Sequence, residues 1–132
     1  MALNLNLGDA HVNAQADALN ALYNGGKMRI YGGVQPAICD TPTAEVVLVE
    51  YALPTPCFGA AVAGVLAANT IADVVAAGSG TATWYRVVAA DGATGLQDGS
   101  VGTAGCNLNM DAVTIVAGVT QHISSWGHTV TK

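Results

Sequence analysis

Three histidines are the residues of this chain best suited to acid–base chemistry: His11, His122 and His128. Hydrolysis through a nucleophile would require a Ser, Cys or Thr beside one of them, with a carboxylate such as Asp98 or Asp111 to orient the imidazole ring. No nucleophile-elbow sequence accompanies any of the histidines. We therefore predict no catalytic residue and a protein that is not an enzyme, unless a cleft joins one of the two C-terminal histidines to an acid and a nucleophile.

Metal-ligand patterns are equally weak. His122 and His128 lie six residues apart on a predicted strand, so they would share one face at a separation of about 20 Å, which is too far for two ligands of one metal ion. The pairs Asp91-Gly92 and Asp98-Gly99 lack the alternating oxygen ligands of a calcium loop. They are instead typical of hairpin turns or, for the second pair, of a bulge. The sequence predicts no metal ion.

The cysteines and glycine-rich segments indicate no cofactor. Cys39, Cys57 and Cys106 are odd in number, widely spaced and without a C-x-x-C pair, which favours small buried side chains over a disulfide or a metal site. The segment Gly78-Ser79-Gly80 lacks the Lys of a phosphate-binding loop, and the other glycines match no nucleotide fingerprint. We expect no cofactor-binding residue.

Aromatic residues make up 5% of the chain. Trp84, Tyr85 and Trp126 could stack on a sugar or a base if they were exposed on one face of a sheet. With so few aromatic residues available, filling the core is the other use that the sequence favours. Exposure of either tryptophan beside polar residues would distinguish a binding module from a structural protein.

Charged residues are scarce, at 10% of the chain against roughly 25% in typical globular proteins. The net charge is −5 and the basic residues do not cluster, which argues against nucleic acid as a partner. A protein with so few charges has little to keep it apart from its neighbours. We expect other protein chains to cover much of the surface, although small polar residues alone could also keep it soluble. The basic residues are Lys27, Arg29, Arg86 and Lys132.

No segment indicates secretion or a membrane. Residues 1–15 carry no positive charge before an apolar run of signal-peptide length. The longest stretch of small apolar residues, 58–68, is interrupted by two glycines and is too short to span a bilayer. We expect a protein made in the cytoplasm, with no membrane as a partner.

The first element that the sequence predicts is a helix over about 9–24, with Asp9 as its N-cap. Four apolar residues spaced four, three and four apart would lie on one face, and Gly25-Gly26 would end the helix. The four residues are Val12, Ala16, Leu19 and Tyr23.

After residue 26 the apolar period becomes two and turn residues recur every few positions. Strands are predicted at 27–31, 45–53, 60–70, 81–90, 96–101, 107–110, 113–116 and 119–130, with a loop between the first two. The run 60–70 is ambiguous, because its alanines favour a helix whereas its glycines and valines favour a strand. Seven to eight short strands predict a mainly β fold over about 27–131, a β-sandwich or jelly-roll-like barrel, and one domain over 1–132 including the helix.

Five segments of the chain resemble a group of small β-rich proteins encoded among the virion structural genes of tailed bacteriophages. They are KMRIYGGVQPA, CFGAAVAGVLAANTI, GTATWYRV, DGSVGTAGCNLNM and TIVAGVTQHISSW, in that order along nearly the whole chain. The resemblance is one of core and turn pattern and carries no catalytic motif.

The resemblance implies a structural protein located in the virion, most often a capsid decoration (cement) subunit. Its partners would be the major capsid protein or other virion proteins and further copies of itself, as a homodimer or homotrimer. Two alternatives remain: a head–tail connector or tail component, and a carbohydrate-binding module on the particle.

Overall fold

A single helix precedes all the strands in the computed structural model, which describes residues 5–130. This helix, α1 (Asp9–Tyr23), buries the predicted apolar stripe: three of the four residues are buried, and Leu19 is partly buried against the same core. The helix is therefore confirmed. The N-cap prediction is wrong, because Gly8 occupies that position without a side-chain hydrogen bond. Asp9 is the first helical residue, where its negative charge is favourable near the positive end of the helix dipole.

Eleven strands follow α1 in the described part of the chain. They are β1 (Lys27–Tyr31), β2 (Val49–Ala52), β3 (Val65–Ala67), β4 (Val74–Val75), β5 (Gly80–Thr81), β6 (Trp84–Val88), β7 (Gly95–Gly102), β8 (Leu108–Met110), β9 (Thr114–Ile115), β10 (Thr120–Gln121) and β11 (Ile123–Thr129).

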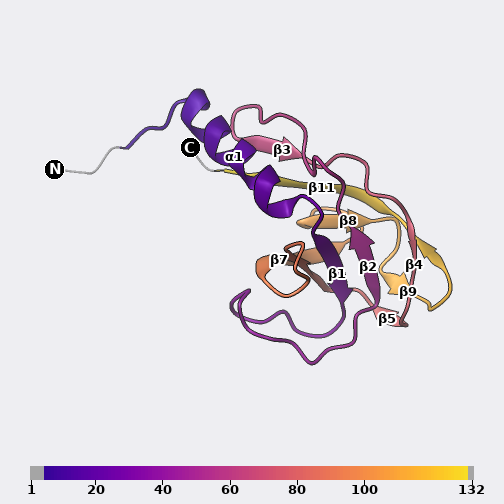
Figure 1. The fold of residues 1–132 in the computed structure, drawn as a ribbon. Helices are drawn as coiled ribbons and strands as arrows, with labels where there is room; N and C mark the ends of the chain where they lie inside the picture. Colours follow the sequence, from indigo (N-terminus) through magenta and orange to yellow (C-terminus); the bar gives the residue numbers. More distant parts are fainter. Residues whose placement is uncertain (1–4, 131–132) are drawn as a thin grey trace.

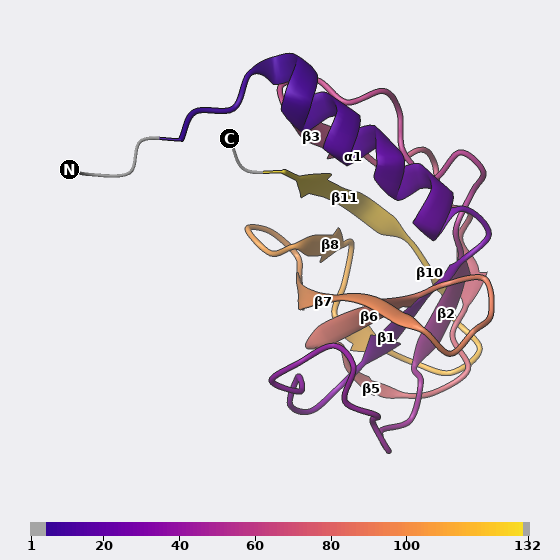
Figure 2. The same ribbon diagram turned by 60° about the vertical axis from the view of Figure 1, so that its left-hand side comes forward.

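Seven of these strands form one sheet, in the order β2-β1-β6-β7-β8-β11-β3, while β10-β4 and β5-β9 form two short ribbons. Neighbouring strands are antiparallel except β7 and β8. The large sheet curls into a half-barrel, and α1 lies across its β3–β11 end (Figures 1 and 2). A mainly β fold with one N-terminal helix is thus confirmed. Residues 1–4 and 131–132 of the predicted domain lie outside the described residues.

The core lies between the inner face of the curled sheet and α1. Within it, the ring of Trp126 on β11 lies 6.2 Å from that of Tyr23 on α1 and 5.1 Å from that of Phe58. The Trp126 indole donates a hydrogen bond to the Tyr85 hydroxyl on β6 at 3.0 Å. This cluster joins the helix to both halves of the sheet.

Most predicted strands are shorter than the sequence suggested: the strand expected at 81–90 is divided into β5 and β6, and that expected at 113–116 comprises two residues. The strand expected at 45–53 begins at Val49, because Glu45 instead binds the Val34 amide and the Trp84 indole. The ambiguous run 60–70 forms a strand at residues 65–67, after a turn in which Ala63 and Gly64 both have positive φ. The strand expected at 119–130 is interrupted at residue 122, between β10 and β11.

The two Asp-Gly pairs have different roles. Asp91 forms the predicted hairpin turn between β6 and β7, where its carboxylate accepts hydrogen bonds from the amides of the second and third residues that follow it. Asp98-Gly99 is neither a turn nor a bulge, because both residues lie inside β7 in regular register with β6. Asp98 faces Arg86, and a Cβ on Gly99 would lie 2.6 Å from the Tyr85 ring. Close packing, and not a turn, explains this glycine.

A second stripe on α1 is polar and binds backbone. Its carboxylate and amide oxygens accept hydrogen bonds from amide groups of the irregular segment 57–64, which runs beside the helix. We call this set the amide ladder. The pairs are Asn13 with Gly64 (2.7 Å), Asp17 with Ala61 (2.8 Å), Asn20 with Phe58 (2.8 Å) and, just beyond the helix, Asn24 with Cys57 (2.9 Å).

Removal of one acceptor tests the amide ladder. Asn20→Ala leaves the Phe58 amide without its partner, so we expect a loss of about 1–3 kcal/mol in the free energy of unfolding. The control is Gln15→Ala, which removes an amide side chain from the exposed face of α1 and so measures the gain in helix propensity that Ala brings. Urea unfolding measures both variants, and equal stabilities would show that the ladder contributes nothing.

Candidate functional site

The three aromatic residues considered for ligand stacking are buried. Trp84 is 1% exposed, Tyr85 0% and Trp126 6%. Core filling is therefore confirmed for Tyr85 and Trp126, whereas Trp84 is buried beneath a loop, and a flat aromatic platform is not present at these positions. Other molecules can therefore contact only the outer face of the sheet, the helix and the loops at the surface.

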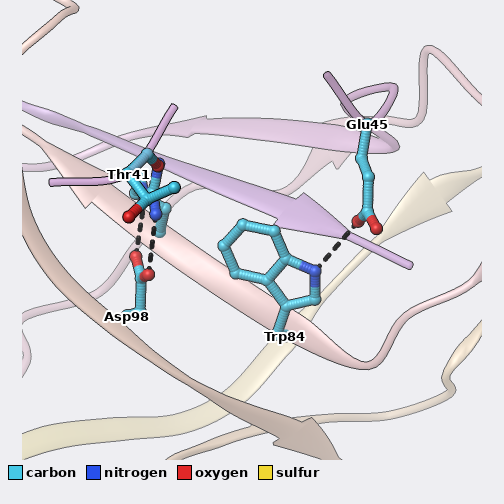
Figure 3. A network of polar contacts seen from close by, with 5 residues as sticks. Thr41, Glu45, Trp84 and Asp98 are labelled. Atoms are coloured by element: carbon cyan, nitrogen blue, oxygen red, sulfur yellow. Dashed lines mark hydrogen bonds and ion pairs between the residues drawn. The ribbon is translucent and has the colours of Figure 1, made fainter. Parts of the chain in front are cut away.

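The outer face of the sheet carries Trp84 beneath the long loop 32–48, which connects β1 to β2. The Trp84 ring stacks on Tyr31 at 4.5 Å, and its indole donates to the carbonyl of Gly32 at 3.0 Å. The indole also donates to the carboxylate of Glu45 at 3.0 Å (Figure 3). Trp84 thus fixes both the beginning and the end of the loop.

A row of four charged residues crosses the same face. The register places Glu50, Arg29, Arg86 and Asp98 side by side on β2, β1, β6 and β7. Each arginine binds the acid beside it: Arg29 Nε lies 2.8 Å from Glu50, and Arg86 binds Asp98 through two nitrogens at 2.7 and 2.8 Å. The hydrogen bond from Arg29 lowers the pKa of Glu50. The flanking carboxylates offset the repulsion between two neighbouring guanidinium groups.

Arg86 is buried and also holds the loop. Its third contact is with the carbonyl of Thr41, which accepts a hydrogen bond from Nη1 at 2.7 Å (Figure 3). The hydrogen bonds with Asp98 raise the pKa of Arg86, so the guanidinium is charged. The middle of loop 32–48 is therefore pinned to the sheet by a buried ion pair.

The pinned loop nevertheless exposes large apolar side chains. Val34 is 83% exposed, Ile38 64% and Val46 74%. We call these three residues of one loop the loop cluster; the loop that carries them lies at the end of the domain opposite α1 (Figure 2). Exposed apolar side chains on a rigid support are typical of protein interaction surfaces.

Two further groups of exposed valines lie at turns. The ribbon cluster comprises Val75, Val116 and Val119, which surround the turn at Ala117-Gly118. Backbone hydrogen bonds from Ala76 to Val119 and from Gly118 to Ala76 hold it at 2.9 Å each. The turn cluster comprises Val62 and Val65, beside the positive-φ turn that follows the amide ladder.

The prediction that His122 and His128 share one face of a strand is wrong. His11 is exposed on α1, and His128 lies on β11, where burial lowers its pKa. His122 lies between β10 and β11. A bulge after Ile123 shifts the register before His128, so the two histidines do not follow the simple alternation of one strand. The carboxylate that meets His122 is Asp73 at 2.6 Å, whereas Asp98 is bound to Arg86.

Metal-binding and redox groups are sparse in the described residues. None of them forms a group of three or more His, Cys, Asp or Glu placed to hold a metal ion. The three cysteines are free thiols, and Cys57 is buried as predicted while the other two are partly buried. Burial raises the pKa of Cys57 to about 12 and that of Cys39 to about 11. Between residues 5 and 130, no helix is long and apolar enough to cross a membrane.

Comparisons of this chain with known proteins found no match, whether among protein-family models, curated proteins or solved structures. Function must therefore be argued from the surface itself.

Two carboxylates of the charged row provide a matched test. Asp98→Asn leaves Arg86 buried without a countercharge, so we expect a loss of about 3–5 kcal/mol in the free energy of unfolding. Glu50→Gln changes the same functional group at the more exposed pair and should cost about 0–1 kcal/mol. Denaturant unfolding compares them, and similar losses would contradict the role assigned to the buried pair.

The contact of His122 with Asp73 predicts a dependence on pH. The hydrogen bond with Asp73 raises the pKa of His122 above its ordinary 6.5. The contribution of this pair to stability is therefore fully present below pH 6.5 and is lost as the pH rises through the raised pKa. NMR titration should show a lower pKa for His122 in Asp73→Asn, while the pKa of His128 stays unchanged. An unshifted His122 would contradict the contact in solution.

Proposed function

We propose that this protein is a structural subunit of a tailed-bacteriophage particle, most specifically a capsid decoration (cement) subunit that acts by packing against other protein chains. The observation that carries the proposal is the combination of a rigidly pinned loop with three exposed apolar clusters on a surface poor in charge. No chemistry is required of such a subunit beyond shape and apolar complementarity.

The distribution of charge supports packing over electrostatic binding. All Lys and Arg side chains among residues 5–130 are in ion pairs within the chain: Lys27 and Arg29 with Glu50, and Arg86 with Asp98. None of these cations is left unpaired to bind phosphates, so nucleic acid is disfavoured as a partner. The exposed valines and isoleucine gain free energy when a partner removes water from them.

The partners follow from the clusters. One apolar cluster would suffice for contact with a single partner. Three clusters on separate loops and turns suit a subunit that contacts several neighbours. We propose that these are the major capsid protein or another virion protein, together with further copies of this chain in a closed dimer or trimer. A head–tail connector or a tail component would use the same kind of surface, and copy number in the particle separates these positions.

A charge placed in the loop cluster tests the proposal. We expect the free protein to be a dimer or trimer by light scattering, unchanged by high salt, because apolar contacts are weakly screened. Ile38→Asp should shift it toward monomer and weaken its retention on purified particles, whereas Gln15→Glu adds the same charge to the exposed face of α1 and should do neither.

Quantitative mass spectrometry of the particles then gives the copy number. Hundreds of copies fit a decoration subunit, and about a dozen fit a connector. A wild-type protein that is monomeric and is released by moderate salt would contradict the proposed packing.

A further inference from the structure

A pocket away from the three apolar clusters forms where β11 begins. It lies between the segment that follows β3 and the start of β11, which run side by side and are joined by a hydrogen bond from the Ala68 amide to the Trp126 carbonyl at 3.1 Å. The cavity has a volume of about 250 Å³. Its lining comprises residues 68–71 and 122–126.

A β-bulge adds one residue to the lining of this pocket. Ile123 pairs with Met110 and Ser125 pairs with Asn109, so Ser124 is an additional residue without a partner on β8. Bulges turn a side chain away from its regular direction and often lie beside binding sites. Ser124 is exposed and lines the pocket, as does Thr70 on the opposite wall.

The other polar groups are held in fixed orientations. Asn69 donates its side-chain amide to the carbonyl of Pro56 at 2.9 Å, and its side-chain oxygen lies beside Gly59, so this side chain holds the wall of the pocket in place. Ser125 accepts a hydrogen bond from Asn109 at 3.0 Å. His122 is oriented through Nδ1 by Asp73, which lies outside the lining, so its Nε2 is the nitrogen left for a ligand. Groups that are already oriented lose little entropy when a ligand binds.

The lining selects the chemical class of the ligand. No Lys or Arg is among the lining residues, and the positive charge of protonated His122 is balanced by Asp73, so an anion gains little. The remaining lining residues are apolar: Ala68, Ile71, Ile123 and Trp126. The volume lies below the roughly 300–1,000 Å³ of sites for drug-sized ligands. A neutral ring that carries several hydroxyl groups matches the lack of net charge, the mixed polar and apolar lining and the small volume of the pocket.

We propose that this pocket binds a single neutral sugar ring, through hydrogen bonds to Ser124, Thr70 and His122 and through contact with the apolar residues of the lining. This inference is independent of the packing function, because the pocket shares no residue with the loop, ribbon or turn clusters. The ring could be a free monosaccharide or the terminal residue of a glycan, since both present the same hydroxyls apart from the one at the anomeric carbon, which the glycosidic bond replaces.

The probes are the methyl glycosides of glucose, galactose, mannose and N-acetylglucosamine, titrated into the full chain and followed by amide NMR at up to about 50 mM, which would saturate a Kd of about 1 mM. We expect at least one glycoside to shift the signals of residues 68–71 and 122–126. Thr70→Val and Ser124→Ala should each weaken that binding by about tenfold, the equivalent of one lost hydrogen bond. Thr81→Val in β5 is the control and should leave it unchanged.

Additional binding experiments identify the source of the sugar and can overturn the proposal. Binding of a polysaccharide that ends in the preferred sugar points to a glycan, whereas binding of the glycoside without the polysaccharide points to a free sugar. The inference is wrong if no glycoside shifts the pocket signals, if inorganic phosphate shifts them instead, or if the two pocket variants bind as tightly as the control. None of these results bears on the oligomeric state. The proposal that this protein packs against other chains is therefore tested separately, and failure of the sugar proposal does not contradict it.

Discussion

The hydroxyl of Tyr85 is the contact on which the rest of the fold depends. It accepts a hydrogen bond from Trp126 on β11 at 3.0 Å and one from Gln97 on β7 at 2.7 Å. Gln97 in turn accepts from the hydroxyl of Tyr23 on α1 at 2.9 Å. A short polar chain therefore joins both halves of the curled sheet and the helix within an apolar core. Burial raises the pKa of Tyr85, so the phenol remains neutral and this arrangement carries no buried charge.

The two faces of the sheet use different interactions for different purposes. On the inner face, aromatic rings and neutral hydrogen bonds join β6, β7 and β11 to α1. On the outer face, the buried pair of Arg86 and Asp98 holds the middle of loop 32–48, and Trp84 holds its ends. A loop of this length would otherwise have many conformations, and ordering it on a partner would reduce affinity. Pinning the loop in the free chain removes most of that cost.

The sequence predicted the elements that obey simple periodicity and missed contacts between distant residues. The apolar stripe of α1, the alternation of β1 and the Asp91-Gly92 hairpin follow from local patterns. The polar stripe of the amide ladder has the same spacing as a solvent-exposed helix face, so nothing local distinguishes the two. Asp98-Gly99 has the composition of a turn, and only its position opposite Arg86 and Tyr85 reveals its role. The pocket was missed for a related reason: Asp73 and His122 are 49 residues apart, and the bulge at Ser124 depends on a register between β8 and β11 that the sequence does not show.

The scarcity of charge links the interior of this protein to its surface. The three described Lys and Arg side chains are all used to hold strands and a loop in place, so the surface that remains has no unpaired cation of these types to guide a partner. Specificity must then come from shape, and shape is specific only where the exposed residues are held rigidly. Because the loop depends on Arg86 and Asp98 for that rigidity, the buried ion pair would contribute to the recognition proposed above although both side chains are buried.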